Sequence, residues 1–166
     1  VRHIPALDGL RGAAVLAVLL FHADLLTGGW LGVDLFFVLS GFLITTLLLG
    51  EVGETGRVDL RAFWGRRARR LMPALLLALL GVALYAAVVA RPVDLGQIRA
   101  DGLATLLYVA NWHTIWQGTS YWDIALAPSP LQHTWSLAIE EQFYVLWPVV
   151  VAAVVRRGSR PTMARR

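Results

Sequence analysis

Residues 71–90 read LMPALLLALLGVALYAAVVA and contain no formally charged side chain. In helical conformation about twenty such residues are long enough to cross the hydrocarbon core of a bilayer. The composition agrees, because 57% of the 166 residues are hydrophobic, 16% are charged and the mean hydropathy is +0.61. Soluble domains are less apolar and about a quarter charged, and disordered chains have low hydrophobicity. The composition therefore excludes both classes and predicts a membrane protein.

Three further apolar stretches are expected to span the membrane. The first helix is predicted at about residues 10–26, and residues 35–50 are long enough to span if 30–34 belong to the same helix. The last helix is predicted at residues 135–155, and Pro148 is expected to kink it.

The arginines predict the orientation. Six arginines lie in residues 51–70 and five in residues 156–166, and cytoplasmic loops are rich in basic residues. The loop 51–70, the polar tail 156–166 and the N-terminus are therefore predicted to be cytoplasmic. This topology requires residues 102–116 to form a partial or re-entrant segment, followed by an outer loop at 117–134. The expected fold is all-α, a polytopic bundle with about four full spans and one short segment.

Polar residues in the first two predicted helices form a candidate catalytic group. Arg11 and His22 are eleven residues apart, which places them on one helix face, roughly 16 Å apart along the axis. The alternative is an arginine that reaches lipid phosphates and a histidine that bonds a neighbouring helix. Asp24 and Asp34 flank a short turn close to His22, and a carboxylate there fixes the tautomer of a general base. Asp24 is alternatively an interface residue of the turn, and Asp34 a helix N-cap.

A cluster of four arginines, Arg66, Arg67, Arg69 and Arg70, precedes the span at 71–90. Guanidinium groups bind phosphate oxygens in pairs and stay charged at any relevant pH. The cluster is predicted to attract a phosphorylated cofactor from the cytoplasm. The alternative is a topology signal that contacts anionic lipid.

Two adjacent carboxylates, Glu140 and Glu141, lie near the start of the last predicted helix. Charges in membrane helices normally face the bundle interior. At least one of the two is therefore expected to point inward, towards His22 or an arginine.

Together these segments resemble the membrane acyltransferase-3 family of O-acyltransferases that modify bacterial surface polysaccharides and related acceptors. The resemblance covers nearly the whole chain, in the family's order. It rests on IPALDGLRG at 4–12 followed by His22, GVDLFFVLSGFLI at 32–44, the arginine cluster through Pro73, and PLQHTWSLAIEEQF at 130–143.

The resemblance implies transfer of an acyl group, commonly acetyl, from cytoplasmic acyl-CoA to a hydroxyl group on the outer side, usually of carbohydrate. It implies that Arg11 and His22 are the essential pair and that the arginine cluster is functionally important. From their chemistry, the arginines would hold the CoA phosphates. His22 would deprotonate the acceptor or briefly accept the acyl group. Asp34, Glu140 or Glu141 would orient its imidazole. Acyl-CoA is then a donor substrate, and no metal, tightly bound cofactor or nucleic acid is expected.

The chain departs from the family in length. Residues 1–155 resemble the N-terminal part of the acyltransferase domain, and the family's later helices are missing. A second polypeptide is then expected to complete the bundle, because unpaired ions in a membrane are costly. Two alternatives remain, a non-catalytic fragment and, less favoured because inverted repeats are lacking, a proton-relay transporter subunit.

Overall fold

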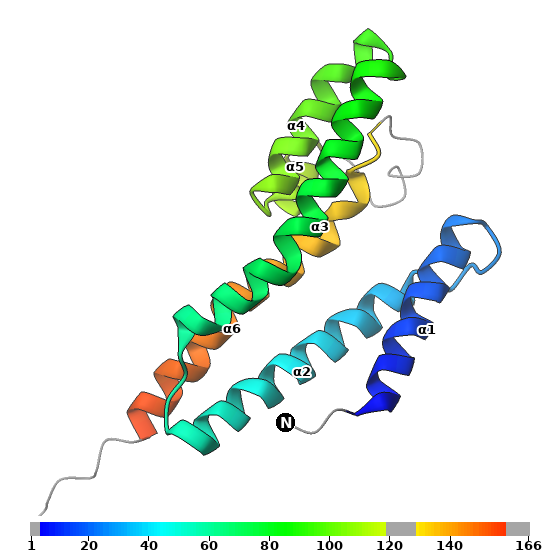
Figure 1. The fold of residues 1–166 in the computed structure, drawn as a ribbon. Coiled ribbons are helices and arrows are strands. Elements are labelled where there is room, and N and C mark those ends of the chain that lie inside the picture. Colours follow the sequence, from blue (N-terminus) through cyan, green and yellow to red (C-terminus); the bar gives the residue numbers. More distant parts are fainter. Residues whose placement is uncertain (1–3, 119–128, 159–166) are drawn as a thin grey trace, which may run out of the picture. The chain divides into compact units, whose positions relative to one another are not determined.

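The computed structural model describes residues 4–118 and 129–158, all of them in helices or short connections (Figure 1). The elements are α1 (Pro5–His22), α2 (Leu31–Thr55), α3 (Leu60–Val88), η1 (Pro92–Asp94), α4 (Leu95–Leu106), α5 (Ala110–Trp116), η3 (Gln132–Thr134) and α6 (Trp135–Gly158). Among the described residues, α1, α2, α3 and the η3–α6 segment are long and apolar enough to cross a membrane. The predicted all-α class with four spans is confirmed.

The first predicted helix was misplaced by about one turn. The boundaries 10–26 are wrong, because α1 already begins at Pro5 and ends at His22. Proline fits the first helical position, where its missing N–H would have had no partner. Asp24 lies just past the helix end with a φ of 57°, a left-handed conformation that stops the helix.

The predicted cytoplasmic loop at 51–70 is also mostly helical. Only residues 56–59 separate α2 from α3. Gly56, at a φ of 72°, ends α2 in the left-handed conformation that favours glycine. Asp59 starts α3, since its side chain accepts a hydrogen bond of 2.9 Å from the backbone N–H of Ala62. The arginine cluster therefore lies on the first turns of a long helix.

Residues 102–116 belong to two short helices. Helix α4 ends at Leu106, α5 begins at Ala110, and Tyr108 between them has a φ of 55°. The helices have 12 and 7 residues, and neither is long enough to cross a bilayer. The re-entrant depth of this segment stays a prediction. Of the expected outer loop at 117–134, residues 119–128 lie outside the described part, as does the tail beyond residue 158.

The chain divides into two compact units, Val1–Val58 with Trp147–Arg166, and Asp59–Leu146. In the first unit α1 packs on α2. A Cβ atom at Gly29 or Gly32 would collide with the carbonyl oxygen of Ala17 or Ala14 of α1. The absence of a side chain at these two positions therefore lets the helices touch. The C-terminal part of α6 adds to this unit, where Trp147 Nε1 donates to Thr45 Oγ1 at 2.9 Å.

Gly32→Ala is expected to loosen the first unit. The new methyl group would meet the Ala14 carbonyl and a Val18 methyl group, and such overpacking costs about 1–3 kcal/mol. Gly53→Ala is the matched control, because Gly53 is also in α2 and a Cβ atom there meets nothing within 4 Å. Thermal unfolding in detergent should show a lower Tm for Gly32→Ala alone. Equal Tm values for the two variants would contradict the close packing of α1 on α2.

In the second unit α4 runs back along the C-terminal half of α3, and α5 follows beside it (Figure 1). Ala104, Ala110 and Ala138 form a small buried cluster that joins α4, α5 and α6. Helix α3 buries only Phe63 and Leu75. Many of its leucines are exposed, as expected of a helix whose outer face contacts lipid.

Candidate functional site

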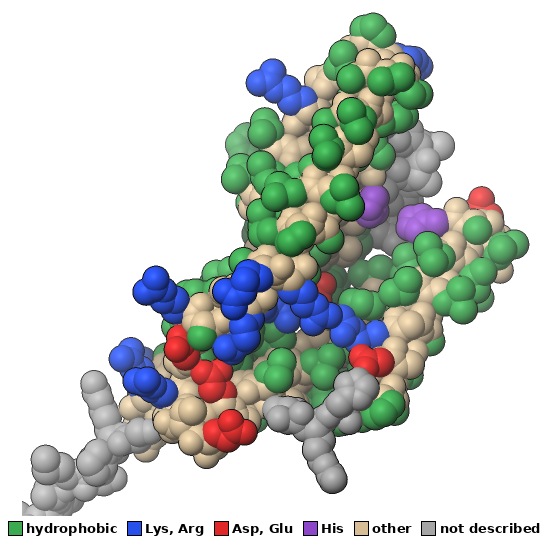
Figure 2. All heavy atoms as spheres, viewed as in Figure 1, with side chains coloured by type: hydrophobic (Ala, Val, Ile, Leu, Met, Phe, Trp, Pro, Cys, Tyr) green, Lys and Arg blue, Asp and Glu red, His purple; other side chains and the backbone are tan. Residues whose placement is uncertain are grey.

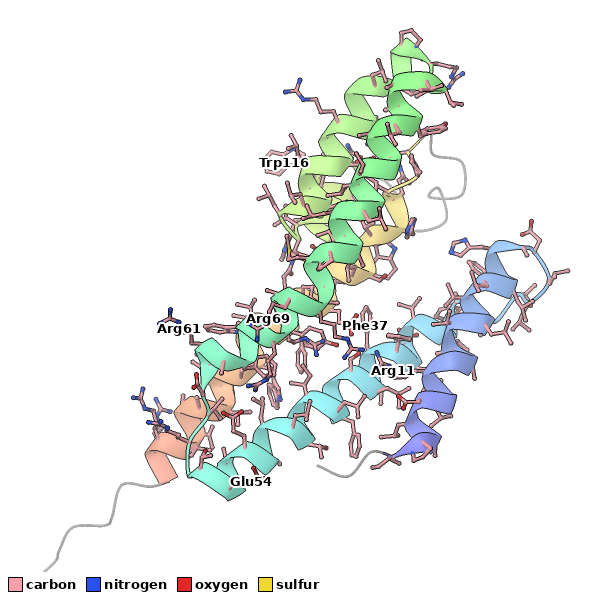
Figure 3. The ribbon with its side chains drawn as sticks, in the orientation of Figure 1. Arg11, Phe37, Glu54, Arg61, Arg69 and Trp116 are labelled. Atoms are coloured by element: carbon pink, nitrogen blue, oxygen red, sulfur yellow. The ribbon has the colours of Figure 1, made fainter. Side chains whose placement is uncertain are left out.

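Both residues of the predicted catalytic pair belong to α1, with Arg11 in its N-terminal half and His22 at its C-terminal end. Arg11 is half-buried, and its guanidinium lies over the ring of Phe36 in α2, 5.2 Å from the ring centroid. Figure 3 shows Arg11 extending from α1 towards α2. His22 is the last residue of α1. Its exposed ring lies edge-on to the ring of Phe21, with the two ring centroids 5.5 Å apart. Helix α1 is continuous between them, which keeps the expected separation along one helix.

The carboxylates near His22 do not pair with it. Asp24 lies in the turn after α1, and Asp34 is exposed in the first turn of α2. Within the described residues, no hydrogen bond or ion pair joins His22 to either of them. The N-cap reading of Asp34 is wrong, because Trp30 occupies that position and no side chain caps the helix. That Asp34, Glu140 or Glu141 orients the imidazole of His22 stays a prediction.

The structure divides the arginine cluster into one packed and three exposed side chains. Successive residues of an α-helix are rotated by about 100°, so Arg66, Arg69 and Arg70 share one face of α3 and Arg67 lies beside it. The three are exposed, whereas Arg67 is half-buried. In Figure 2 arginine side chains gather over the N-terminal part of α3, and hydrophobic side chains cover its C-terminal half.

Arg67 stacks on an aromatic ring of α6. Its guanidinium carbon lies 3.5 Å from the centroid of the Tyr144 ring, a cation–π contact. Tyr144 is 4% exposed. Its hydroxyl donates to Glu140, and its carbonyl accepts a hydrogen bond of 3.2 Å from Trp64 Nε1 of α3. Tyr144 is therefore held from both sides and fixes the orientation of Arg67.

Glu140 and Glu141 both belong to this cluster of charges. Glu140 bonds Tyr144 directly, and Glu141 interacts electrostatically with Arg67. Among the described residues, Arg67 Nε and Glu141 Oε1 are buried without a hydrogen-bond partner. A buried charge is stable only when it is paired. The structure thus brings Arg67 and the two glutamates together, while His22 belongs to the other unit.

The sequence did not predict a network of side-chain amides that includes Gln142, the residue after Glu141. Gln142 Nε2 donates to the Tyr108 carbonyl at 2.8 Å and to Asn111 Oδ1 at 2.9 Å. These bonds hold the corner between α4 and α5 against α6. The only signal in the sequence was an asparagine in a short apolar segment, which does not show its partner.

A second polar group that the sequence reasoning missed is Asp101 with His113. Asp101 is buried in α4, and its Oδ1 atom lies 3.2 Å from Nε2 of His113 in α5. An acidic residue within an apolar helix was the available signal. In the described part of the chain no three His, Asp or Glu side chains lie close enough to hold a metal ion.

A family model described as an acyltransferase domain matches residues 4–164. O-acetyltransferase OatA of Staphylococcus aureus is 46% identical over 158 residues, which cover 94% of this chain and 26% of that protein. The putative peptidoglycan O-acetyltransferase YrhL of Bacillus subtilis is 47% identical over 166 residues, with coverages of 98% and 26%.

Peptidoglycan O-acetyltransferase OatA of Listeria monocytogenes is 42% identical over 164 residues and has the same two coverages, 98% and 26%. The chain thus spans about a quarter of the length of these relatives. No solved structure matches it.

Proposed function

Because the chain belongs to the acyltransferase-3 family, we propose that it moves an acetyl group from cytoplasmic acetyl-CoA to a carbohydrate hydroxyl group outside the cell membrane. The observation that carries the proposal is the family match over residues 4–164, which contains Arg11 and His22 on one candidate span. Two of the relatives are named for peptidoglycan, which supports peptidoglycan as the acceptor class. The protein is then multi-pass, with its N-terminus in the cytoplasm.

The donor side of the proposed reaction uses the arginine cluster. Arg66, Arg69 and Arg70 are exposed on α3, where they can bind the phosphate groups of CoA in pairs. Arg67 is engaged with Tyr144 and supports the cluster from within. The basic residues of α3 and of the tail favour the cytoplasmic side for this end of the helix.

The acceptor side uses His22. The imidazole accepts the proton of the acceptor hydroxyl as its oxygen attacks the thioester carbonyl carbon. The carbon–sulfur bond then breaks, and the CoA thiolate takes the proton from the imidazolium. In the alternative course His22 first accepts the acetyl group and then passes it to the hydroxyl oxygen. Arg11 lies on the same helix, eleven residues nearer the N-terminal end that is proposed to face the cytoplasm.

The experiment that tests this function follows labelled acetyl-CoA in membranes that contain the protein. Thioester cleavage and transfer of the label to soluble glycan fragments of peptidoglycan are measured together, with proton flux as a second readout. His22-dependent cleavage and transfer without flux is the expected result. Flux without cleavage would favour the transporter alternative, and absence of both would favour the non-catalytic one.

Arg69→Gln/Arg70→Gln is expected to raise the KM for acetyl-CoA roughly tenfold with little change in kcat. Each lost charge-assisted bond to a phosphate group weakens donor binding by about 1.5–3 kcal/mol, discounted because these side chains are exposed. Arg61→Gln is the control, since Arg61 is also exposed on α3 but lies outside the cluster. Initial rates at varied acetyl-CoA give both constants. An unchanged KM in the double variant would remove these two arginines from the donor site.

A further inference from the structure

A small polar cavity lies in the second unit, between α4, α5 and η3. Asp101 lines this cavity and is 7% exposed. Its Oδ1 atom accepts a hydrogen bond of 3.0 Å from Gln97 Nε2 and lies 3.2 Å from His113 Nε2. Gln117 links these two residues, since its Oε1 accepts from Gln97 Nε2 at 3.0 Å and its Nε2 lies 2.9 Å from His113 Nε2. One carboxylate oxygen of Asp101 is thus fixed by its neighbours.

The other oxygen of Asp101 is unsatisfied. Among the described residues, Asp101 Oδ2 and Gln132 Oε1 are buried without a hydrogen-bond partner, and both residues line the cavity. The hydroxyl groups of Thr105 and Thr134 also line it, but they bond each other at 2.7 Å. Because buried polar atoms are almost always hydrogen-bonded, the two open acceptors indicate a missing donor.

The size of the cavity limits what that donor is. The cavity volume is about 10 Å³, which suits one water-sized or hydroxyl-sized group. Lipid acyl chains carry no O–H or N–H group that a carboxylate oxygen can accept from, and the acyl-CoA donor is proposed to bind at the arginine cluster, at the other end of α3. A sugar carries several hydroxyl groups on one rigid ring, so it can place one in the cavity and present a second donor nearby.

We propose that this cavity is a subsite for the carbohydrate acceptor, in which one sugar hydroxyl group donates to Asp101 Oδ2 and a second donor of the same sugar reaches Gln132 Oε1. The identity of the ligand rests on the proposed function. Helix α4 lies along the C-terminal half of α3, whereas the arginine cluster lies at its start. If the cluster faces the cytoplasm, the cavity lies towards the outer side, where the acceptor is found.

The test measures sugar binding without catalysis. A disaccharide of N-acetylglucosamine and N-acetylmuramic acid is added to the protein in lipid nanodiscs, and binding is followed by saturation-transfer NMR. Asp101→Asn and Gln132→Met are each expected to weaken binding at least tenfold. Arg99→Gln is the control on the exposed face of α4 and should bind as the native protein does.

Gln132→Met separates a binding role from a structural one. Its side-chain oxygen has no partner within the described residues, so its replacement should leave the Tm unchanged while binding is lost. No binding to the native protein would mean that water alone fills the cavity and would overturn the proposal. Equal binding by the native protein and both variants would overturn it as well. His22-dependent cleavage of acetyl-CoA is measured separately, so failure of the proposed function is distinguishable from failure of the subsite.

Discussion

His22→Ala is expected to lower acetyl transfer by at least a hundredfold while the protein still accumulates in the membrane. A positioned general base typically contributes a factor of about 10²–10⁴ to a rate. The His22 ring is exposed at the end of α1 and has no hydrogen bond or ion pair in the described structure, so its removal should not disturb packing. Initial rates of transfer from labelled acetyl-CoA to glycan fragments measure the effect.

Leu19→Ala is the matched control for this experiment. Leu19 lies one turn earlier on α1 and is 61% exposed, so it tests whether any truncation at this end of the helix affects the rate. The control is expected to keep most of the native rate. Transfer that survives in His22→Ala would show that another group takes the proton. Asp24→Asn and Asp34→Asn, compared in the same assay, then show which carboxylate supports His22.

The spans were predictable because hydropathy reports directly on what crosses a bilayer. Residues 71–90 indicated a membrane helix on composition alone, and α3 contains nearly all of them. The same signal failed at the charged end of this helix. Arginine is a good helix former, so the chain stays helical through the cluster although it ceases to be apolar. Hydropathy therefore locates the membrane span but does not show that α3 already begins at Leu60.

The candidate site was predictable as residue types and only partly as geometry. The sequence placed Arg66, Arg67, Arg69 and Arg70 in one cluster, but four adjacent arginines look alike without their neighbours. What separates Arg67 from the others is Tyr144, which comes from a helix 77 positions later in the chain. A contact at such sequence distance depends on how α3 and α6 pack and has no local signal.

The cavity at Asp101 also depends on contacts between residues that are far apart in the sequence. Asp101 and Gln97 are one helical turn apart, which sequence spacing can predict. Its pairing with His113 requires the break at Tyr108, where the chain reverses between α4 and α5. Gln132 arrives from a third element. The sequence alone therefore did not predict that these polar residues line one cavity.

Arg67→Met is expected to lower the free energy of unfolding by roughly 3 kcal/mol. Removing one partner from a buried charge cluster costs about 3–5 kcal/mol, and the lower end applies because Arg67 is half-buried. Loss of the guanidinium removes the cation over Tyr144 and leaves Glu141 facing a protein interior without its positive partner. Equilibrium unfolding in detergent, with the Tm as a second readout, measures the change.

Two further variants decide whether charge is the cause. Arg70→Met removes another arginine of the cluster that is exposed on the same helix, and it should change stability by less than about 0.5 kcal/mol. Arg67→Met combined with Glu141→Gln should recover part of the lost stability, because the second substitution removes the carboxylate that the first one leaves unpaired. If the two losses simply add, Arg67 stabilises the protein through its packing on Tyr144 and not through Glu141.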